Sequence, residues 1–440
     1  MTDIHHEATA SKASAQRGFV SNLYRAVWRW HFYAGLLILP FMITLAVTGA
    51  IYLFREEVDT FVHADFKQVT PVDEARLAPS EIIAAALAAQ PGSVVKYTDP
   101  RTDGLSTEVT IQPGTGGRMA VYVNQYDGEV LEVRAELSTF AWTVRYLHSF
   151  RYFGPTPRMW IEIVGGWAIL MVLTGIYLWW PRGQKGGVVS VRGDRTRRVF
   201  WRDMSWSSVW GAKVNEWANG SNFGYPAGVR TDIPMSGQRL DDVAKTSWTL
   251  EQAQIPKTTP PAPNTMPIRV DAAVAQFETL GLHRGFSVRL PRSDTGVYSG
   301  SVYPDDLSQQ RVVHLDQYSG EALVDMSYSD YGAMGRWLEF GINTHMGQTY
   351  GLMNQLVLRA VCAGIVLMAV SAAVMWWKRR PSGGLGVPPL PSDRRVFIGL
   401  FVILGIGGVL FPLTGLSLIV MVALDMLWQR FRSGSKVSEA

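Results

Sequence analysis

Gln-Tyr-Asp-Gly-Glu at residues 125–129 returns as Gln-Tyr-Ser-Gly-Glu at residues 317–321. After each copy come a histidine, His148 or His345, and an apolar run that closes with a Trp-Trp pair. The pair begins 31 residues after the histidine in both copies. A repeat on this scale predicts two copies of one structural unit, with one histidine in the same place in each. Two equivalent histidines at two membrane helices can ligate one metal centre between them.

Each copy also predicts a small α+β module. A helical stretch is followed by segments in which apolar and polar residues alternate, which predicts strands with one buried face. The Tyr-Asp-Gly and Tyr-Ser-Gly sequences predict hairpin turns. The modules cover residues 65–135 and about 265–328, with helices at 79–89 and 270–280, strands near 120–123 and 296–303, and an extended proline-rich linker at 255–267 between them.

Three apolar runs, at about 32–54, 159–180 and 353–377, reach the roughly 20 residues that a membrane-spanning helix needs. A fourth run at 396–428 is too long for one straight crossing, and Phe411-Pro412 divides it. The predicted fold is therefore a membrane α-helical bundle with three clear spans and a C-terminal hydrophobic segment, joined to two small α+β modules.

Arginine and lysine residues set the expected orientation. They precede the first span, so the N-terminus is expected in the cytoplasm and the first module outside it. Basic clusters also follow the second and third spans, and two cytoplasmic clusters require a further crossing between residues 182 and 353. Residues 198–224 hold no apolar run of sufficient length. We infer that the second copy lacks its first helix, so the side of the second module stays open.

Composition limits the cofactor chemistry. The net charge of +4 is small and its basic residues lie beside apolar runs, which gives no indication of nucleic-acid binding. The single cysteine, Cys362, excludes an internal disulfide, covalent attachment of a c-type haem and a four-cysteine iron–sulfur cluster from this chain alone. A redox cofactor would have to be held non-covalently or by histidines.

These elements resemble the PepSY-associated transmembrane family, often described as iron-regulated membrane proteins. The matching sequences are Trp28-Arg-Trp-His31, the repeated Gln-Tyr-x-Gly turn, Leu147-His148, Thr344-His-Met-Gly-Gln348 and the two Trp-Trp pairs with the basic residues after them. The resemblance covers residues 20 to 428. It implies inner-membrane di-haem proteins, similar to siderophore reductases, that move electrons to ferric siderophores in the periplasm.

In those terms the chain divides as follows: a disordered tail (1–22), the first transmembrane helix (23–54), PepSY-like module 1 (55–140), the second transmembrane helix with its preceding interfacial segment (141–182), a basic loop and linker (183–264), PepSY-like module 2 (265–328), the third transmembrane helix with its interfacial segment (329–381) and the C-terminal segment (382–440).

The resemblance implies haem b ligated by histidine. His148 and His345 both precede spans whose far ends are cytoplasmic, so we expect them to ligate one haem iron at the outer face, where bis-imidazole ligation suits electron transfer. His31 lies at the cytoplasmic end of the first helix and would serve a second haem. The repeat aligns His31 with Met204 rather than with a histidine, so the inner site keeps one ligand only. The alternative is that these three histidines lie at the membrane interface and bind water or lipid headgroups.

Other polar residues have less specific interpretations. We expect His63, His283 and His314 to be structural. Glu162 and Glu339 are either buried partners, neighbours of a haem propionate or residues exposed at the lipid interface. The Trp pairs are interface anchors, and the glycines of the spans most simply permit close helix packing.

The leading functional expectation is an inner-membrane b-type haem protein of the ferric-siderophore reductase type. Its partners would be membrane lipid, a ferric siderophore or ferric iron, and an electron donor, either a quinol or a separate reductase, because no dinucleotide-binding fingerprint is present. The alternative is a membrane-anchored PepSY binding or regulatory protein without redox activity. A third possibility is a degenerate copy that folds but no longer functions.

Overall fold

A computed structural model of the chain describes residues 2–179, 235–240, 253–258, 262, 265–382, 386–387, 405, 411–421 and 423–424. The chain divides into two compact units. Unit 1 comprises Met1–Ala50, Arg145–Met204 and Val361–Ala440, and unit 2 comprises Ile51–Val144 and Ser205–Ala360. The segment at 198–224, where a crossing was inferred to be missing, lies outside the described residues.

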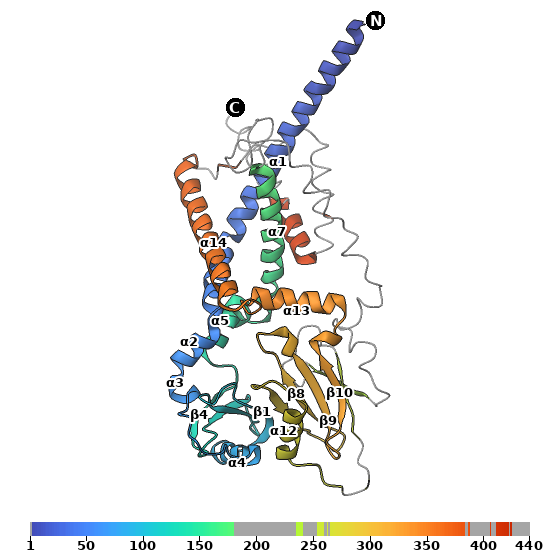
Figure 1. Cartoon of the computed structure of the whole chain (residues 1–440). Helices are drawn as coiled ribbons and strands as arrows, with labels where there is room; N and C mark the ends of the chain where they lie inside the picture. Colours follow the sequence, from blue (N-terminus) through green and yellow to red (C-terminus); the bar gives the residue numbers. More distant parts are fainter. Residues whose placement is uncertain are drawn as a thin grey trace. The chain divides into compact units, whose positions relative to one another are not determined.

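Unit 2 is built on one antiparallel eight-stranded sheet in the order β10-β9-β8-β7-β1-β2-β3-β4 (Figure 1). Its strands are β1 (Ser93–Thr98), β2 (Thr107–Gln112), β3 (Met119–Val123), β4 (Val130–Ala135), β7 (Ser287–Arg289), β8 (Val297–Val302), β9 (Arg311–Asp316) and β10 (Ala322–Ser327). Each module contributes four consecutive strands, and the strands predicted near residues 120 and 297 are present as β3 and β8.

The two modules share one sheet. β1 of module 1 pairs with β7 of module 2, with Tyr97 opposite Val288. An edge strand carries unpaired backbone N–H and C=O groups, and each module satisfies the edge of the other. Because an open hydrogen-bonded sheet cannot continue through a bilayer, we expect both modules on the same side of the membrane.

Two helices cover one face of this sheet, α4 (Pro79–Ala89) and α12 (Val270–Thr279), as Figure 1 shows. Both occupy the predicted helical stretches. One continuous core joins them: Ile82 of α4 and Phe277 of α12 belong to the same buried cluster as strand residues of both modules. The backbone N–H of Ser80 also donates to Asp271 Oδ1 at 2.8 Å, which ties the start of one helix to the other.

The repeated Gln-Tyr-x-Gly sequence forms the β3–β4 and β9–β10 turns. Gly128 (φ 77°) and Gly320 (φ 75°) adopt the left-handed conformation that glycine permits. The glutamines before them are buried, and each donates through Nε2 to a carbonyl of the loop between the first two strands of its module, Gln125 to Asp103 O (3.0 Å) and Gln317 to Ser293 O (2.9 Å). The motif therefore fixes one loop against another in each copy.

Three helices among the described residues are long and apolar enough to cross a membrane, as predicted. They are Asn22–Tyr52 within α1 (Thr2–Tyr52), α7 (Trp160–Trp179) and α14 (Gly351–Arg379). The tail expected to be disordered is helical from Thr2, because alanine, glutamate, lysine and glutamine favour helix even in a polar segment. Of the fourth apolar run, the structure describes the helix Pro412–Met421.

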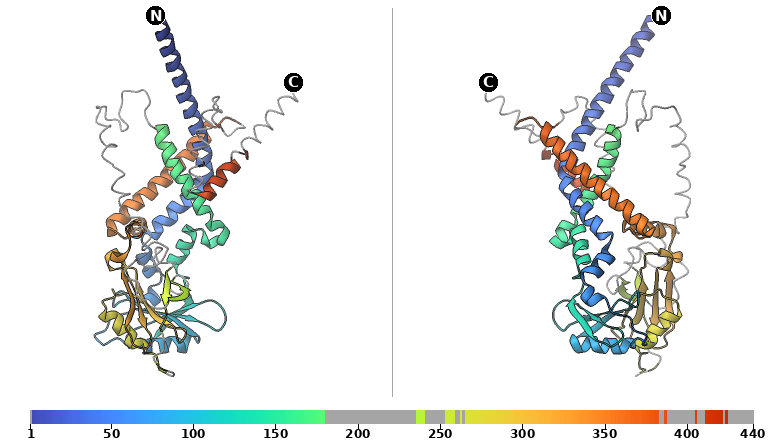
Figure 2. Two further views of the ribbon diagram at one scale, coloured as in Figure 1. Left: turned by 90° about the vertical axis from the view of Figure 1, so that its right-hand side faces the viewer. Right: turned by 60° about the vertical axis from the view of Figure 1, so that its left-hand side comes forward.

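Helices α1 and α7 lie side by side in unit 1, and the views of Figure 2 agree on this. A Cβ at Gly35 of α1 would lie 3.2 Å from Met171 Cε of α7, so the small residue allows the close approach. Trp376 of α14 packs against Phe32 of α1 with ring centroids 6.5 Å apart.

The remaining elements are α2 (Arg55–Val62), α3 (Ala64–Lys67), α5 (Phe140–His148), η1 (Arg151–Phe153), α6 (Pro155–Arg158), β5 (Met235–Arg239), β6 (Gln254–Pro256), η3 (Leu307–Gln309), η4 (Tyr328–Asp330) and α13 (Ala333–His345). β5 and β6 form a two-stranded sheet, so the predicted proline-rich linker begins as a strand.

Candidate functional site

His31 of α1 lies against a Thr-Gly step of α7. Its Nδ1 is 2.8 Å from Thr174 Oγ1. The same hydroxyl donates to the carbonyl oxygen of Leu170, one turn earlier in α7, at 2.6 Å. The next residue is Gly175, where an added Cβ would lie 3.4 Å from His31 Cε1. The imidazole therefore rests on the backbone of the neighbouring helix, with a hydroxyl at one nitrogen.

His148 of α5 has the same surroundings on α1. Its Nδ1 is 3.0 Å from Thr48 Oγ1, and that hydroxyl donates to the carbonyl oxygen of Thr44 at 2.7 Å. The following residue is again glycine, and a Cβ at Gly49 would lie 3.1 Å from His148 Cε1. Two of the predicted ligands thus occupy equivalent seats in unit 1, each made of a Thr-Gly step on an adjacent helix.

The two seats lie at different depths along α1. Thr48 follows His31 by 17 residues, which corresponds to about 25 Å at a rise of about 1.5 Å per residue. This separation approaches the thickness of a bilayer hydrocarbon core, which is about 30 Å.

The repeated histidines end their helices in the same way. α5 ends at His148 and α13 ends at His345. Two residues later the backbone is left-handed in both copies, at Phe150 (φ 54°) and Gly347 (φ 78°). A phenylalanine in this conformation is strained. Its buried ring, 5.8 Å from that of Phe41, supports it.

His345 belongs to unit 2, and its side chain is exposed at the end of α13. The turn behind it is tightly bonded. The N–H of Gln348 donates to Asn343 O at 3.0 Å and the N–H of Gly347 to Thr344 O at 3.1 Å, which is the Schellman pattern of a helix C-terminus. Arg55 also donates to the carbonyl oxygen of Met346 at 3.2 Å.

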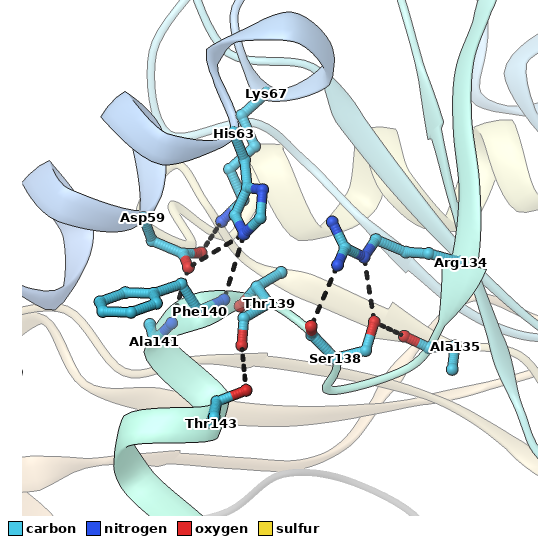
Figure 3. A network of polar contacts seen from close by, with 10 residues as sticks. All are labelled: Asp59, His63, Lys67, Arg134, Ala135, Ser138, Thr139, Phe140, Ala141 and Thr143. Atoms are coloured by element: carbon cyan, nitrogen blue, oxygen red, sulfur yellow. Dashed lines mark hydrogen bonds and ion pairs between the residues drawn. The ribbon is translucent and has the colours of Figure 1, made fainter.

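A polar network in unit 2 caps the first turn of α5, the helix that carries His148 (Figure 3). The N–H of Ala141 donates to Asp59 Oδ1 at 2.8 Å, and the N–H of Phe140 donates to His63 Nε2 at 3.1 Å. Lys67 pairs with Asp59. An acceptor at a helix N-terminus satisfies amides that have no partner within the helix. His63 must be neutral to accept here, and burial lowers its pKa, with Asp59 opposing that shift and Arg134 and Lys67 adding to it.

The other predicted residues lie in different surroundings. His314 is fully buried, its Nδ1 is 2.8 Å from Ser299 Oγ, and burial lowers its pKa to about 3. His283 Nδ1 is 2.9 Å from the carbonyl oxygen of Arg284. Glu162 is half-buried, and its carboxylate accepts the N–H of Leu413 at 3.0 Å, at the start of Pro412–Met421. Glu339 is buried on α13.

Thr48 and Thr174 were not predicted as site residues, although the sequence carries a signal for them. Thr-Gly-Ala-Ile-Tyr-Leu at 48–53 and Thr-Gly-Ile-Tyr-Leu at 174–178 are near-copies within two apolar helices. A Thr-Gly pair repeated within two apolar helices indicates a position where a side chain from another helix packs closely.

Within the described part of the chain, no group of three or more His, Cys, Asp or Glu residues could hold a bare metal ion. A haem iron needs no such group, because the macrocycle supplies four ligands and the protein supplies one or two axial ones. Single histidines with one nitrogen hydrogen-bonded and a glycine beneath the ring fit that requirement.

Comparison with known proteins agrees with the layout of helices and modules. No curated protein matches the chain. The family model described as the PepSY-associated TM region matches residues 28–379, from the segment that precedes His31 to the end of α14. The chain is a membrane protein, and it belongs to the PepSY-associated TM family.

Proposed function

We propose that this chain is an inner-membrane b-type haem protein that passes electrons across the membrane, to a ferric siderophore or ferric iron in the periplasm. The observation that carries the proposal is the equivalent seating of His31 and His148, each with Nδ1 against a threonine hydroxyl of a neighbouring helix. Histidines that ligate a metal nearly always have their second ring nitrogen hydrogen-bonded in this way.

His148 and His345 are the proposed axial ligands of an outer haem, and His31 is the proposed ligand at an inner position. Bound haem would supply a one-electron carrier. The protein would orient the imidazoles, exclude water from them through the apolar helices, and set how strongly each nitrogen donates. The arginine and lysine pattern supports a cytoplasmic N-terminus and a periplasmic first module, on the side where a ferric substrate would arrive.

The test is haem content. The full-length protein is purified in mild detergent, and haem per chain is measured by the pyridine haemochrome method with reduced-minus-oxidised spectra. We expect about one b-type haem per chain, lost in His148→Ala and in His345→Ala. The matched control is His283→Ala, because this exposed histidine of module 2 has its Nδ1 2.9 Å from the carbonyl oxygen of its neighbour Arg284. Wild-type protein without haem would overturn the proposal.

A second candidate is a binding or regulatory protein of the PepSY type, with the helices as anchors. It is favoured by a cavity of about 640 Å³ in module 2, lined by polar residues that include Ser308, Arg311, Asp325 and Asp330. Folded wild-type protein that contains no haem would support this second function.

A further inference from the structure

We propose that Thr48 and Thr174 are positioning residues that hold His148 and His31 in one tautomer, with the ring proton on Nδ1 and the lone pair on Nε2. This inference rests on the proposed haem function for its consequence. Its geometric basis is independent of that function.

A threonine hydroxyl has one proton to donate and two lone pairs that accept. In Thr174 the proton is directed to Leu170 O at 2.6 Å, and in Thr48 to Thr44 O at 2.7 Å. Both distances suit O–H···O bonds, and the back-bond to the carbonyl four residues earlier is the usual choice of a threonine inside a helix. With the proton used, each Oγ1 can only accept from the imidazole.

The imidazole must then be the donor. A neutral histidine carries its proton on one nitrogen and a lone pair on the other. The Nδ1 to Oγ1 distances of 2.8 Å for His31 and 3.0 Å for His148 suit an N–H···O bond. The proton therefore lies on Nδ1, and Nε2 is the atom able to bind a metal.

The glycine after each threonine makes the bond possible. Cε1 of the imidazole lies next to Nδ1, and a side chain at Gly49 or Gly175 would come within 3.1 Å or 3.4 Å of Cε1. A larger residue would lift the ring away from the hydroxyl. Threonine supplies the acceptor and glycine supplies the space.

The second copy of the repeat supports the pairing of seat and histidine. Counted back from the Trp-Trp pair, the position of Thr174 corresponds to Ser371 in α14, and Gly175 corresponds to Ala372. The residue that aligns with His31 in that copy is Met204, not histidine. The Thr-Gly step is thus altered in the copy where the histidine is replaced.

The direct test is the histidine tautomer in haem-free protein, read from ¹⁵N and ¹³C chemical shifts of labelled histidine in detergent, with His31→Gln and His148→Gln used for assignment. We expect the Nδ1–H form for both. Thr48→Val should shift His148 alone toward the Nε2–H form, and Thr48→Ser should restore it; Thr174→Val and Thr174→Ser should act likewise on His31. The matched control is Thr44→Val, one turn away on α1, where the hydroxyl donates to Pro40 O at 3.0 Å. Wild-type histidines in the Nε2–H form would overturn the inference.

The haem readout separates this inference from the proposed function. An acceptor at Nδ1 makes the ligand more basic, so Thr48→Val should bind the outer haem about 10- to 100-fold more weakly, as is usual for outer-shell partners. It should also shift the midpoint potential to more positive values, and Thr48→Ser should reverse both changes. Haem-loaded wild type with unchanged affinity and potential in Thr48→Val overturns the inference alone. A wild type that binds no haem overturns the proposed function, and the tautomer result still decides the geometry.

Discussion

The core shared by the two modules can be tested at one contact. Gly300 of β8 faces Phe277 of α12, and a Cβ there would lie 2.5 Å from Phe277 Cε1. Normal carbon contacts are about 3.5–4.0 Å, so the ring would have to move by about 1 Å. Phe277 is fully buried. We therefore expect Gly300→Ala to destabilise unit 2 by about 1–3 kcal/mol, the usual cost of overpacking a core.

The complementary change is Phe277→Leu, which removes the ring atoms that the new methyl would meet. Alone it should cost about 1–3 kcal/mol through lost packing, less than the 3–5 kcal/mol typical of Phe→Ala. In the double variant the alanine methyl occupies part of the vacated space. We expect the double variant to be more stable than the sum of the single changes by about 1 kcal/mol, as residues in contact are not additive.

The assay is hydrogen–deuterium exchange of the full-length protein in detergent, followed by mass spectrometry. Because the cluster around Phe277 contains residues of both modules, Gly300→Ala should reduce protection in β1–β2 as much as in β8–β9. The control is Gly341→Ala on α13, where an added Cβ meets no atom within 4 Å. Loss of protection confined to module 2, or strict additivity in the double variant, would refute the shared core.

Three further outcomes follow from the structure. The stabilisation of α5 by neutral His63 should be fully present above the ordinary histidine pKa near 6.5 and lost as pH falls through its lowered pKa. The protection factor of the Phe140 amide, which corrects for the slower intrinsic exchange in acid, should therefore fall at low pH, and His63→Gln should remove this dependence. Arg289 is buried, and within the described part of the chain its Nε and Nη1 have no hydrogen-bond partner. Arg289→Met should therefore raise the free energy of unfolding of unit 2 by about 1–3 kcal/mol, measured as a higher melting temperature. A lower melting temperature would show that the guanidinium has a partner. Gly49→Ala should weaken haem retention and Gly165→Ala, where a Cβ meets nothing within 4 Å, should not.

Much of the fold follows from local patterns. The alternation near Val121 and Tyr298, the helix at Pro79–Ala89 and the two Gly turns depend on residues close in sequence, and each was predictable. The three apolar spans were equally clear, because bilayer thickness sets their length.

The remaining features depend on partners far apart in the chain. β7 has three residues, Ser287–Arg289, and neither its composition nor that of β1 specifies that they pair. His31 and His148 could be named as candidates, but their threonine partners lie 143 and 100 residues away in sequence. Such contacts arise from helix packing, and the spacing of residues in the sequence does not predict which helices pack together. Glu162 is similar, since its partner Leu413 lies beyond the second module.

The joint between the modules has the symmetry of a dimer. The N–H of Asp99 donates to Phe286 O (2.9 Å), and the N–H of Leu290 donates to Val95 O (3.4 Å). Adding 191 to the residue number converts Asp99 into Leu290 and Val95 into Phe286, so this shift exchanges the two bonds. The same shift converts Tyr97 into its own partner, Val288. A two-fold axis thus passes between these two residues, and the interface is isologous in the sense used for homodimers. A chain carrying one such module would expose the β1 edge, so we expect single-module relatives to close it with a second copy of themselves, and this chain to have made that dimer permanent by joining the halves.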